Sequence, residues 1–499
     1  MSAAIRKTSG RQELTGWLLV ALAILLRARQ YFFNRSLWGD EVMLALNIVN
    51  RSFSGLLRPL QYSQSPPLGF LYIEKLFITL FGNHDHILRL FPFLAGIAAI
   101  FVMAWLAKRI LPGWAGLAAL GIFTFSWQSV YYASEVRSYS SDVLFTLILI
   151  AAAHLCSGTQ VPRRNWLWLL GAGMLAPWMS HPSVFVIAGI GIVLGIANLI
   201  RATWSNLIWL FSSILFWGSN FAIIFILSLR HIVANKMLLD FFRKAFMPLP
   251  PWHDWGWFLR SSEVIFENLL HMPMISGLAV LLIGIFYMVR RNWKTTALLL
   301  TPIAAACMAS GLGKYPFWTR FLLFALPLLC FFLAAGMRAL YGQAARFIPK
   351  IRFLFSAVIV AMIFWQPVVF SVQKFRSPEN KKDIKSLMAA LRADRQPQDS
   401  LYVHYASQKQ FKYYAGFYGM HRNDAVIGTT AKESAAPLVA DIDALAGRSR
   451  VWFLFANRFH ADRFDQEKSM LEHLEHIGVQ RKKYHATGAN LYLYDLSRP

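Results

Sequence analysis

The sequence "SLWGDEV" (residues 36–42) places two adjacent carboxylates, Asp40 and Glu41, directly after the first long apolar stretch of the chain. Of the 499 residues, 56% are hydrophobic and only 15% are charged, which is typical of a protein that crosses a membrane several times. An acid beside a bilayer is unfavourable unless it has a partner or a function. The acid pair is therefore a candidate functional site at the edge of a membrane.

The net charge of +25 does not indicate a nucleic-acid-binding protein, because the basic residues occur in short clusters between apolar runs. The first apolar run is not followed by a small-residue cleavage site, so it is predicted to be a retained span. The three cysteines lie within apolar runs without a Cys-x-x-Cys spacing. Neither a disulfide framework nor a cysteine metal site is predicted.

A helix that spans a bilayer needs about 20 predominantly apolar residues. On this basis the chain is predicted to be a polytopic α-helical membrane protein with about eleven transmembrane helices. The expected spans are 14–33, 89–107, 114–131, 140–156, 166–181, 183–200, 204–229, 268–289, 295–312, 321–340 and 353–372.

Alternate connections carry the basic residues, as at Lys108–Arg109 and Arg290–Arg291, so the positive-inside rule places these connections and the N-terminus in the cytoplasm. Ten of the eleven acids in residues 1–372 fall on the opposite face or at span ends near it. The positive-inside rule concerns Lys and Arg and does not require that the acids be segregated. Their segregation therefore indicates a functional surface on the outer face.

Residues 373–499 differ in composition, since they hold fourteen of the 25 acids. Short strands are predicted at 400–406, 450–457 and 490–496, and an amphipathic helix at 465–478. The sequence therefore predicts two domains: a transmembrane domain, 1–372, and a small C-terminal α/β domain, 373–499, on the outer (periplasmic) face of the inner membrane.

The first outer connection, residues 34–88, is too long for a simple link between two spans. Residues 40–50 and 67–82 both have helical spacing, and both are predicted to lie in the outer interface. A short true span at 68–82 is the alternative, and it would invert every later connection. For the acid pair, the alternative to function is that Asp40 caps the first of these helices and Glu41 is a first-turn acid.

Other candidate residues lie at the predicted outer ends of spans. "YYASEVRSYS" (131–140) contains Glu135, suited to hydroxyl groups, and Arg137, suited to phosphate, although an interfacial ion pair is the alternative. Arg89 lies about one turn inside the second span. Lys314 and Arg320, in "GKYPFWTRFLLFALP" (313–327), are suited to a lipid phosphate or to simple snorkelling at a helix end.

A metal site is suggested only weakly. His84, Asp85 and His86 are adjacent in "NHDHILRLFP" (83–92), but no third spaced ligand accompanies them, and a solvated loop is the alternative. His181, in "SHPS", is a further possible ligand or a locally hydrogen-bonded residue. A divalent metal is the one cofactor that these residues suggest.

Five stretches in order carry a resemblance to a known family: "WGDE", "SPPLGFLYIEKLF", "LRLFPFLAG", "YYASEVRSYS" and "YPFWTRFLLFALPLL". Together they resemble the GT-C glycosyltransferases, in the branch that contains protein O-mannosyltransferases and the bacterial lipid A aminoarabinose transferase. The chain is most similar to the bacterial subgroup called RgtA/B/C/D-like. Many relatives have a histidine before the Pro-Leu where this chain has "QSPPLG", a departure that weakens a metal site.

The resemblance implies eleven to thirteen spans, interfacial helices in the first outer loop and a polyprenyl-phosphate sugar as donor. It implies that Asp40 is the base that activates the acceptor, which would be an envelope glycan, lipid or protein. Glu41 would support Asp40, and Glu135 would orient hydroxyl groups. The phosphate would be bound by Arg89, Arg137, Lys314 and Arg320.

Two other functions are compatible with the composition: a secondary transporter or flippase of lipid-linked sugars, and a polymerase or ligase of lipid-linked glycans. Transporters tend to place ionisable groups near the bilayer midplane within repeated halves. Here the acids gather at one face and no repeat is visible, which favours the transferase.

Overall fold

The computed structural model describes residues 2–230, 240–431, 434–456, 460–461 and 464–497. The chain divides into two compact units. The helical unit comprises Met1–Phe33 and Arg51–Pro378, and the C-terminal unit comprises Asn34–Asn50 and Glu379–Pro499. The segment that carries Asp40 and Glu41 thus belongs to the same unit as the C-terminal region, which the sequence did not reveal.

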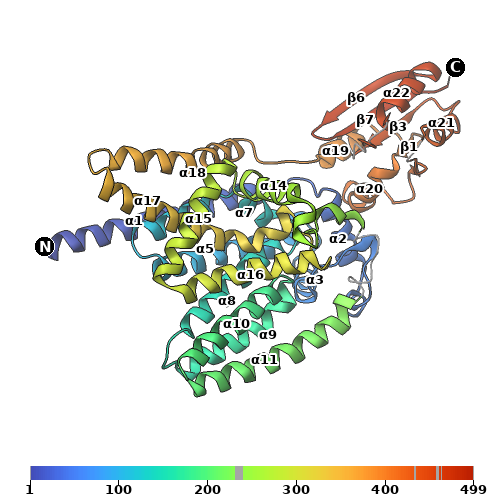
Figure 1. Ribbon diagram of the computed structural model, residues 1–499. Helices are drawn as coiled ribbons and strands as arrows, with labels where there is room; N and C mark the ends of the chain where they lie inside the picture. The colour runs from blue at the N-terminus through green and yellow to red at the C-terminus, as the bar shows by residue number, and fades with distance from the viewer. Residues whose placement is uncertain (1, 231–239, 432–433, 457–459, 462–463, 498–499) are drawn as a thin grey trace. The chain divides into compact units, whose positions relative to one another are not determined.

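The helical unit consists almost entirely of helices joined by short links (Figure 1). Its elements are α1 (Ser2–Phe32), η1 (Ser54–Leu57), η2 (Gln61–Ser63), α3 (Leu68–Phe81), α4 (Asp85–Leu88), α5 (Leu90–Ile110), α6 (Trp114–Phe125), α7 (Trp127–Tyr131), η3 (Tyr132–Ser134), α8 (Tyr139–Leu155), α9 (Arg163–Met179), α10 (Ser183–Ile200), α11 (Trp204–Ile224), η4 (Phe225–Leu229), η5 (Arg243–Ala245), η6 (Pro251–His253), α14 (Trp255–Glu263), η7 (Val264–Leu269), α15 (Met274–Arg291), α16 (Trp293–Gly311), η8 (Thr319–Ala325), α17 (Leu326–Phe347) and α18 (Arg352–Arg376).

Helices occur at all eleven positions predicted to span the membrane, but not all of them are long and apolar enough to do so. Within the described part of the chain, six helices meet both requirements, and a seventh span results if the bent pair Trp127–Ser134 and Tyr139–Leu155 counts as one. The protein is therefore a polytopic helical membrane protein with six or seven candidate spans. The count of eleven is not reached on this criterion.

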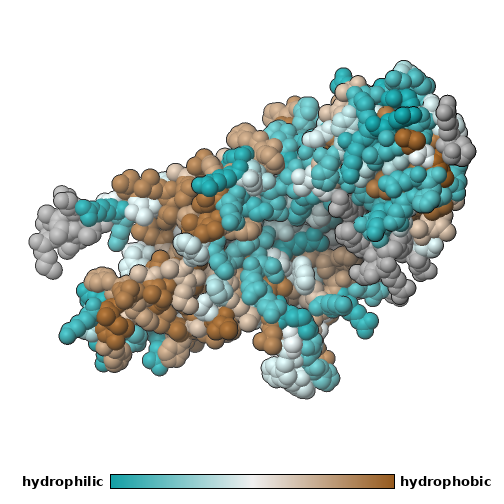
Figure 2. Space-filling model, turned by 90° about the horizontal axis from the view of Figure 1, so that it is seen from above, coloured by the Kyte–Doolittle hydropathy of each residue, from teal (hydrophilic) through white to brown (hydrophobic). Residues whose placement is uncertain are grey.

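The segment Thr319–Phe347, formed by η8 and α17, lies at the centre of the helical unit. Within its most apolar stretch, 89% of the residues are buried. Within the most apolar stretch of α18, only 11% of the residues are buried, so this helix presents an apolar surface outward. In Figure 2, hydrophobic side chains gather over part of the helical unit beside hydrophilic ones, and an exposed apolar surface of this kind suits contact with lipid.

Helices α15 and α17 approach each other through two glycines. A Cβ added to Gly284 would lie 1.8 Å from the Phe332 carbonyl oxygen, and one added to Gly336 would lie 2.0 Å from that of Val280. Helices in lipid gain little from hydrophobic burial and associate through close backbone packing at small residues. The two glycines therefore hold the peripheral helix α15 against the central helix.

Both helices predicted in the first outer connection are present, as α2 (Gly39–Asn50) and α3. Helix α3 has 14 residues and buries one face, which includes Phe70, Leu71 and Glu74. It is not among the candidate spans, so the alternative of a true span at 68–82 finds no support.

The C-terminal unit contains a five-stranded sheet in the order β2-β1-β3-β7-β6. Strands β1 (Ser400–Val403), β2 (Val426–Ile427) and β3 (Val451–Phe455) are parallel, whereas β7 (Ala489–Asp495) is antiparallel to β3, and β6 (Val479–Ala486) to β7. In register, Tyr402 lies between Val426 and Phe453. A separate short pair joins β4 (His460–Ala461) and β5 (Phe464–Asp465).

The helices of this unit are α2, α19 (Ile384–Asp394), η9 (Tyr405–Ser407), α20 (Gln408–Tyr414), η10 (Ala415–Tyr418), α21 (Ala436–Asp443) and α22 (Gln466–Ile477). The three predicted strands and the predicted helix at 465–478 are confirmed as β1, β3, β7 and α22. Strand β6 was missed because its residues, "VQRKKYHA", are mostly polar and exposed at the edge of the sheet.

Candidate functional site

Glu41 is held in a buried ion pair in the C-terminal unit. Its Oε2 lies 2.5 Å from Arg35 Nη1, and the side chains of Glu41 and Arg35 are 0% and 1% exposed. The same oxygen accepts a hydrogen bond from the Trp38 backbone N–H, at 3.3 Å. Glu41 therefore fixes the loop before α2. Sequence reasoning missed Arg35, although it is the only basic residue in "NRSLWGDE".

Asp40 lies in the first turn of α2 and is partly exposed. The Val42 backbone N–H donates to the Trp38 carbonyl oxygen at 3.0 Å, so the first turn begins before Asp40. The alternative that Asp40 is the N-cap is therefore wrong. Burial lowers the pKa of Lys409, and the Asp40 carboxylate opposes this change, which identifies Lys409 as a nearby cation.

The loop before α2 is also tied to the C-terminal region by hydrogen bonds from both backbone and side chains. These are Lys385 Nζ to the Asn34 carbonyl oxygen (2.7 Å), Ser36 Oγ to Asp383 Oδ1 (3.1 Å) and the Leu37 N–H to the Tyr414 hydroxyl (2.7 Å). In addition, Lys381 Nζ lies 4.1 Å from the centre of a Trp38 ring, a cation–π contact. The C-terminal region thus positions the segment that carries Asp40.

In the helical unit, Glu135 and Arg137 lie at the break between η3 and α8. The helices on the two sides of this break, Trp127–Ser134 and Tyr139–Leu155, are bent by 117°. Glu135 is 1% exposed, and Arg137 is partly exposed. Broken helices in membranes place polar backbone and side chains where they line a site rather than face lipid.

Arg320 lies beside this break. The ring of its neighbour Phe321 is 6.3 Å from that of Tyr139, the first residue of α8. The Arg320 guanidinium is 5.3 Å from the Phe321 ring and 5.9 Å from that of Phe242. Aromatic contacts of this kind orient the guanidinium without neutralising its charge.

Arg89 is fully buried at the start of α5. Helix α5 packs along the break, since a Cβ added to Gly96 would lie 2.7 Å from that of Ala133. The structure therefore brings the elements that carry Arg89, Glu135, Arg137 and Arg320 together. Lys314 differs, because it is exposed in the loop after α16 and its side chain forms no hydrogen bond or ion pair with any residue that the structure describes.

The weak metal hypothesis is not supported. No group of three histidine, cysteine or acidic side chains that could hold a metal ion is present in the described ranges. His84 is exposed, Asp85 begins α4, and the His86 carbonyl oxygen accepts a hydrogen bond from the Tyr31 hydroxyl at 2.9 Å. His181 Nε2 lies 3.0 Å from the Ser65 carbonyl oxygen, which favours a structural role.

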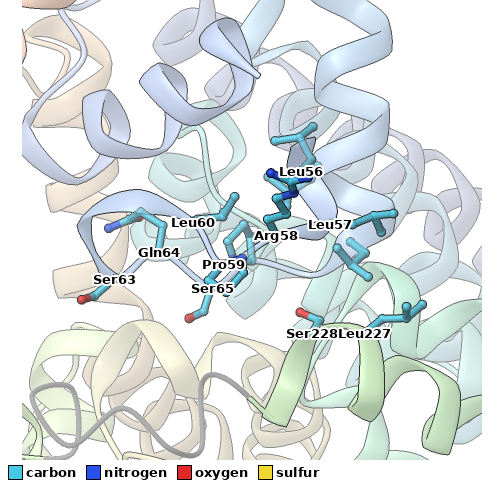
Figure 3. Close-up of a pocket in the computed structure, with 13 residues that line it drawn as sticks. Leu56, Leu57, Arg58, Pro59, Leu60, Ser63, Gln64, Ser65, Leu227 and Ser228 are labelled. Carbon is cyan, nitrogen blue, oxygen red and sulfur yellow. The ribbon is translucent and has the colours of Figure 1, made fainter. Parts of the chain in front are cut away.

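A surface pocket in the helical unit was not predicted from the sequence. It is lined by the segment 56–66 and the start of α3, with Leu227 and Ser228 forming another wall (Figure 3). Among the residues that the structure describes, its lining is mainly apolar, and Arg58 is the single charged residue. Tyr62 and Ser63, within this segment, have positive φ angles of 62° and 51°, a conformation that is unusual for residues other than glycine.

The model of a family described as dolichyl-phosphate-mannose-protein mannosyltransferase (PMT_2) matches residues 64–232. No curated protein matches the sequence. The crystal structures of ArnT from Cupriavidus metallidurans, in the apo state and bound to undecaprenyl phosphate, are each similar to this chain with a TM-score of 0.53 at 12% identity. Each match covers 96% of this chain and 98% of ArnT.

The oligosaccharyltransferase of Archaeoglobus fulgidus, solved tethered with an acceptor peptide containing the NVT sequon, gives a TM-score of 0.51 at 11% identity. That match covers 97% of this chain and 74% of the other. At such identities the likeness shows a shared fold. The match to the mannosyltransferase family model over residues 64–232 and the ArnT-like fold together make this chain, a multi-pass membrane protein, similar to membrane glycosyltransferases.

Proposed function

We propose that the protein transfers a sugar from a polyprenyl-phosphate donor to a hydroxyl group of an envelope glycan, lipid or protein, at the outer face of the inner membrane. One observation carries the proposal: Asp40 is a partly exposed carboxylate in a first turn that is fixed by the buried Arg35–Glu41 pair. The binding of undecaprenyl phosphate by ArnT, which shares the fold, supports the choice of donor. Membership of the RgtA/B/C/D-like subgroup and a total of eleven spans are part of the same proposal.

In the proposed reaction Asp40 accepts the proton of the acceptor hydroxyl as its oxygen attacks the anomeric carbon. The new carbon–oxygen bond forms opposite the bond to the donor phosphate, which breaks with its electron pair leaving on the lipid phosphate. Attack opposite the phosphate inverts the anomeric centre. One carboxylate suffices because the phosphate needs no general acid to leave, whereas inverting and retaining glycosidases generally use two. The phosphate leaves as a stable anion, and cations rather than a general acid are needed to stabilise it.

Arg137 and Arg320 are proposed to bind the donor phosphate, because their elements meet at the helix break. A guanidinium binds phosphate through two parallel hydrogen bonds, which an ammonium cannot reproduce. We expect Arg137→Lys and Arg320→Lys to lose part of the transfer activity and the alanine variants to lose more. Transfer rates in membrane vesicles, normalised to protein level, test this. Full activity in both alanine variants would remove these residues from the mechanism.

The proposed orientation places the basic connections in the cytoplasm and the C-terminal unit outside. Cysteines introduced at Gln160 and Asn292 are expected to be protected from a membrane-impermeant thiol reagent in intact cells. A cysteine introduced at Thr430 is expected to react. Labelling is compared with that of permeabilised cells, in which all three should react. The reverse pattern in intact cells would show that the orientation is inverted and would contradict the outer-face site.

The proposed function is tested by mass spectrometry of envelope glycans, lipids and glycoproteins from cells with and without the gene. The expected result is one component whose mass rises by a single glycosyl residue when the gene is present. Loss of a long glycan instead would indicate a polymerase or ligase. Movement of a labelled lipid-linked sugar across vesicles without a covalent product would indicate a flippase. The added mass gives the class of the sugar, such as a hexose or a pentose. Undecaprenyl-phosphate sugars of that class are then compared as donors, and the one that is transferred is used in kinetic assays.

A further inference from the structure

Helix α20 lies against α2 within the C-terminal unit. Lys409 Nζ lies 3.6 Å from Met43 Sδ. A Cβ added to Gly39 would lie 3.9 Å from Gln410 Nε2. The amide of Gln410 therefore lies beside the residue that precedes Asp40, at the start of α2.

Gln410 is only 1% exposed, and neither its Nε2 nor its Oε1 has a hydrogen-bond partner among the residues that the structure describes. Burial of an amide without partners is unfavourable, and such groups are rare in folded proteins. Gln466, a second buried glutamine of the same unit, has both partners: its Oε1 lies 3.0 Å from His404 Nε2, and its Nε2 donates to the Ala431 carbonyl oxygen at 2.7 Å. Gln410 thus differs from the buried glutamine Gln466 and invites a functional explanation.

The chemistry of an amide limits what the missing partner can be. An amide offers one hydrogen-bond acceptor and two donors without a charge, and a hydroxyl group is likewise both donor and acceptor. A phosphate would be matched by a cation, and a metal ion by carboxylate, imidazole or thiolate ligands. The amide of Gln410 therefore fits a sugar or alcohol hydroxyl. A group of this kind is also what the neighbouring Asp40 is proposed to deprotonate.

We propose that Gln410 is an acceptor-binding residue, whose amide hydrogen-bonds the acceptor and holds its hydroxyl group against Asp40. The proposal rests on the proposed role of Asp40 as base. It gives the C-terminal region a direct part in the reaction: the region positions the loop before α2 and also contributes a side chain that selects the acceptor.

The test compares Gln410→Met with Gln466→Met, since methionine has nearly the same length and removes the amide in both. Vesicles from cells without the gene supply the acceptor, and the labelled undecaprenyl-phosphate sugar is the donor. For Gln410→Met we expect an unfolding temperature equal to or above that of the wild type and a rise in the KM for acceptor of about threefold to tenfold. For Gln466→Met we expect a lower unfolding temperature and unchanged transfer per folded molecule.

Wild-type kinetics in Gln410→Met would overturn the proposal, and so would a fall in its unfolding temperature like that of Gln466→Met, because the amide would then be structural. Asp40→Asn is measured in the same assay. If Asp40→Asn is inactive and Gln410→Met is fully active, the role of Gln410 is refuted and the role of Asp40 is kept. An active Asp40→Asn refutes the base and, with it, the placement of the acceptor hydroxyl by Gln410.

Discussion

Replacement of Asp40 by asparagine is expected to lower the transfer rate by at least about a hundredfold while the protein remains folded. A general base contributes about 10²–10⁴-fold to a rate, and an amide cannot accept the proton. Asparagine keeps the size of the side chain and most of its hydrogen-bonding capacity. The helix itself does not depend on Asp40 as a cap, because its first turn begins before this residue.

The level of the variant in membranes, its binding of undecaprenyl phosphate and its transfer rate are all measured on one preparation. Binding by the variant should equal that of the wild type, since the donor phosphate is assigned to arginines of the helical unit. Asp383→Asn is a matched control, because Asp383 lies in the same unit and accepts a hydrogen bond from Ser36 in the same loop. We expect this control to keep most of the activity. A well-expressed and active Asp40→Asn variant would show that Asp40 is not the base.

The positions of the helices were predictable from the sequence, because each long helix is marked by a continuous apolar run. Helix lengths were harder to predict. Residues 114–131 form one apolar stretch, but α6 ends at Phe125 and a second short helix begins at Trp127. Hydropathy does not register such a break. The bend of 117° at the Glu135 segment depends on how the two helices pack and has no local signal beyond a loop.

The residue types of the site were predictable from the sequence, but the residues that hold them in place were not. Asp40 and Glu41 were found as an acid pair beside an apolar run. Their packing against residues more than 300 positions later was not visible, because no periodic pattern encodes a contact over such a separation. The Gln410 amide was missed for the same reason: a glutamine in a short helix becomes informative only when its burial and its missing partners are known.

Removal of one partner of the Arg35–Glu41 pair is expected to destabilise the protein strongly. Arg35→Met leaves a buried carboxylate without its cation, and Glu41→Leu leaves a buried guanidinium without its anion. Each change is expected to lower the free energy of unfolding by about 3–5 kcal/mol. The readouts are the unfolding temperature in detergent and the level of folded protein in membranes.

The exposed pair Arg260–Asp254 provides the comparison. Its N–O distance of 2.6 Å is nearly the same, but its side chains are 60% and 47% exposed. Water screens such a pair, so Arg260→Met is expected to change the stability by at most about 1 kcal/mol. Equal and small effects of Arg35→Met and Arg260→Met would contradict the structural role assigned to the buried pair.

The double variant Arg35→Met/Glu41→Leu separates stability from function. Replacing a buried ion pair with apolar residues removes both charges at once, so much of the stability lost in either single variant should return. Transfer should not return with it, because the Trp38 N–H loses its acceptor on Glu41 and the loop before Asp40 is no longer fixed. A catalytic group displaced by about 1 Å can lose about a hundredfold in rate. A double variant that is both stable and fully active would show that the pair serves folding alone, and that Asp40 is positioned by the hydrogen bonds of Ser36 and Leu37 without it.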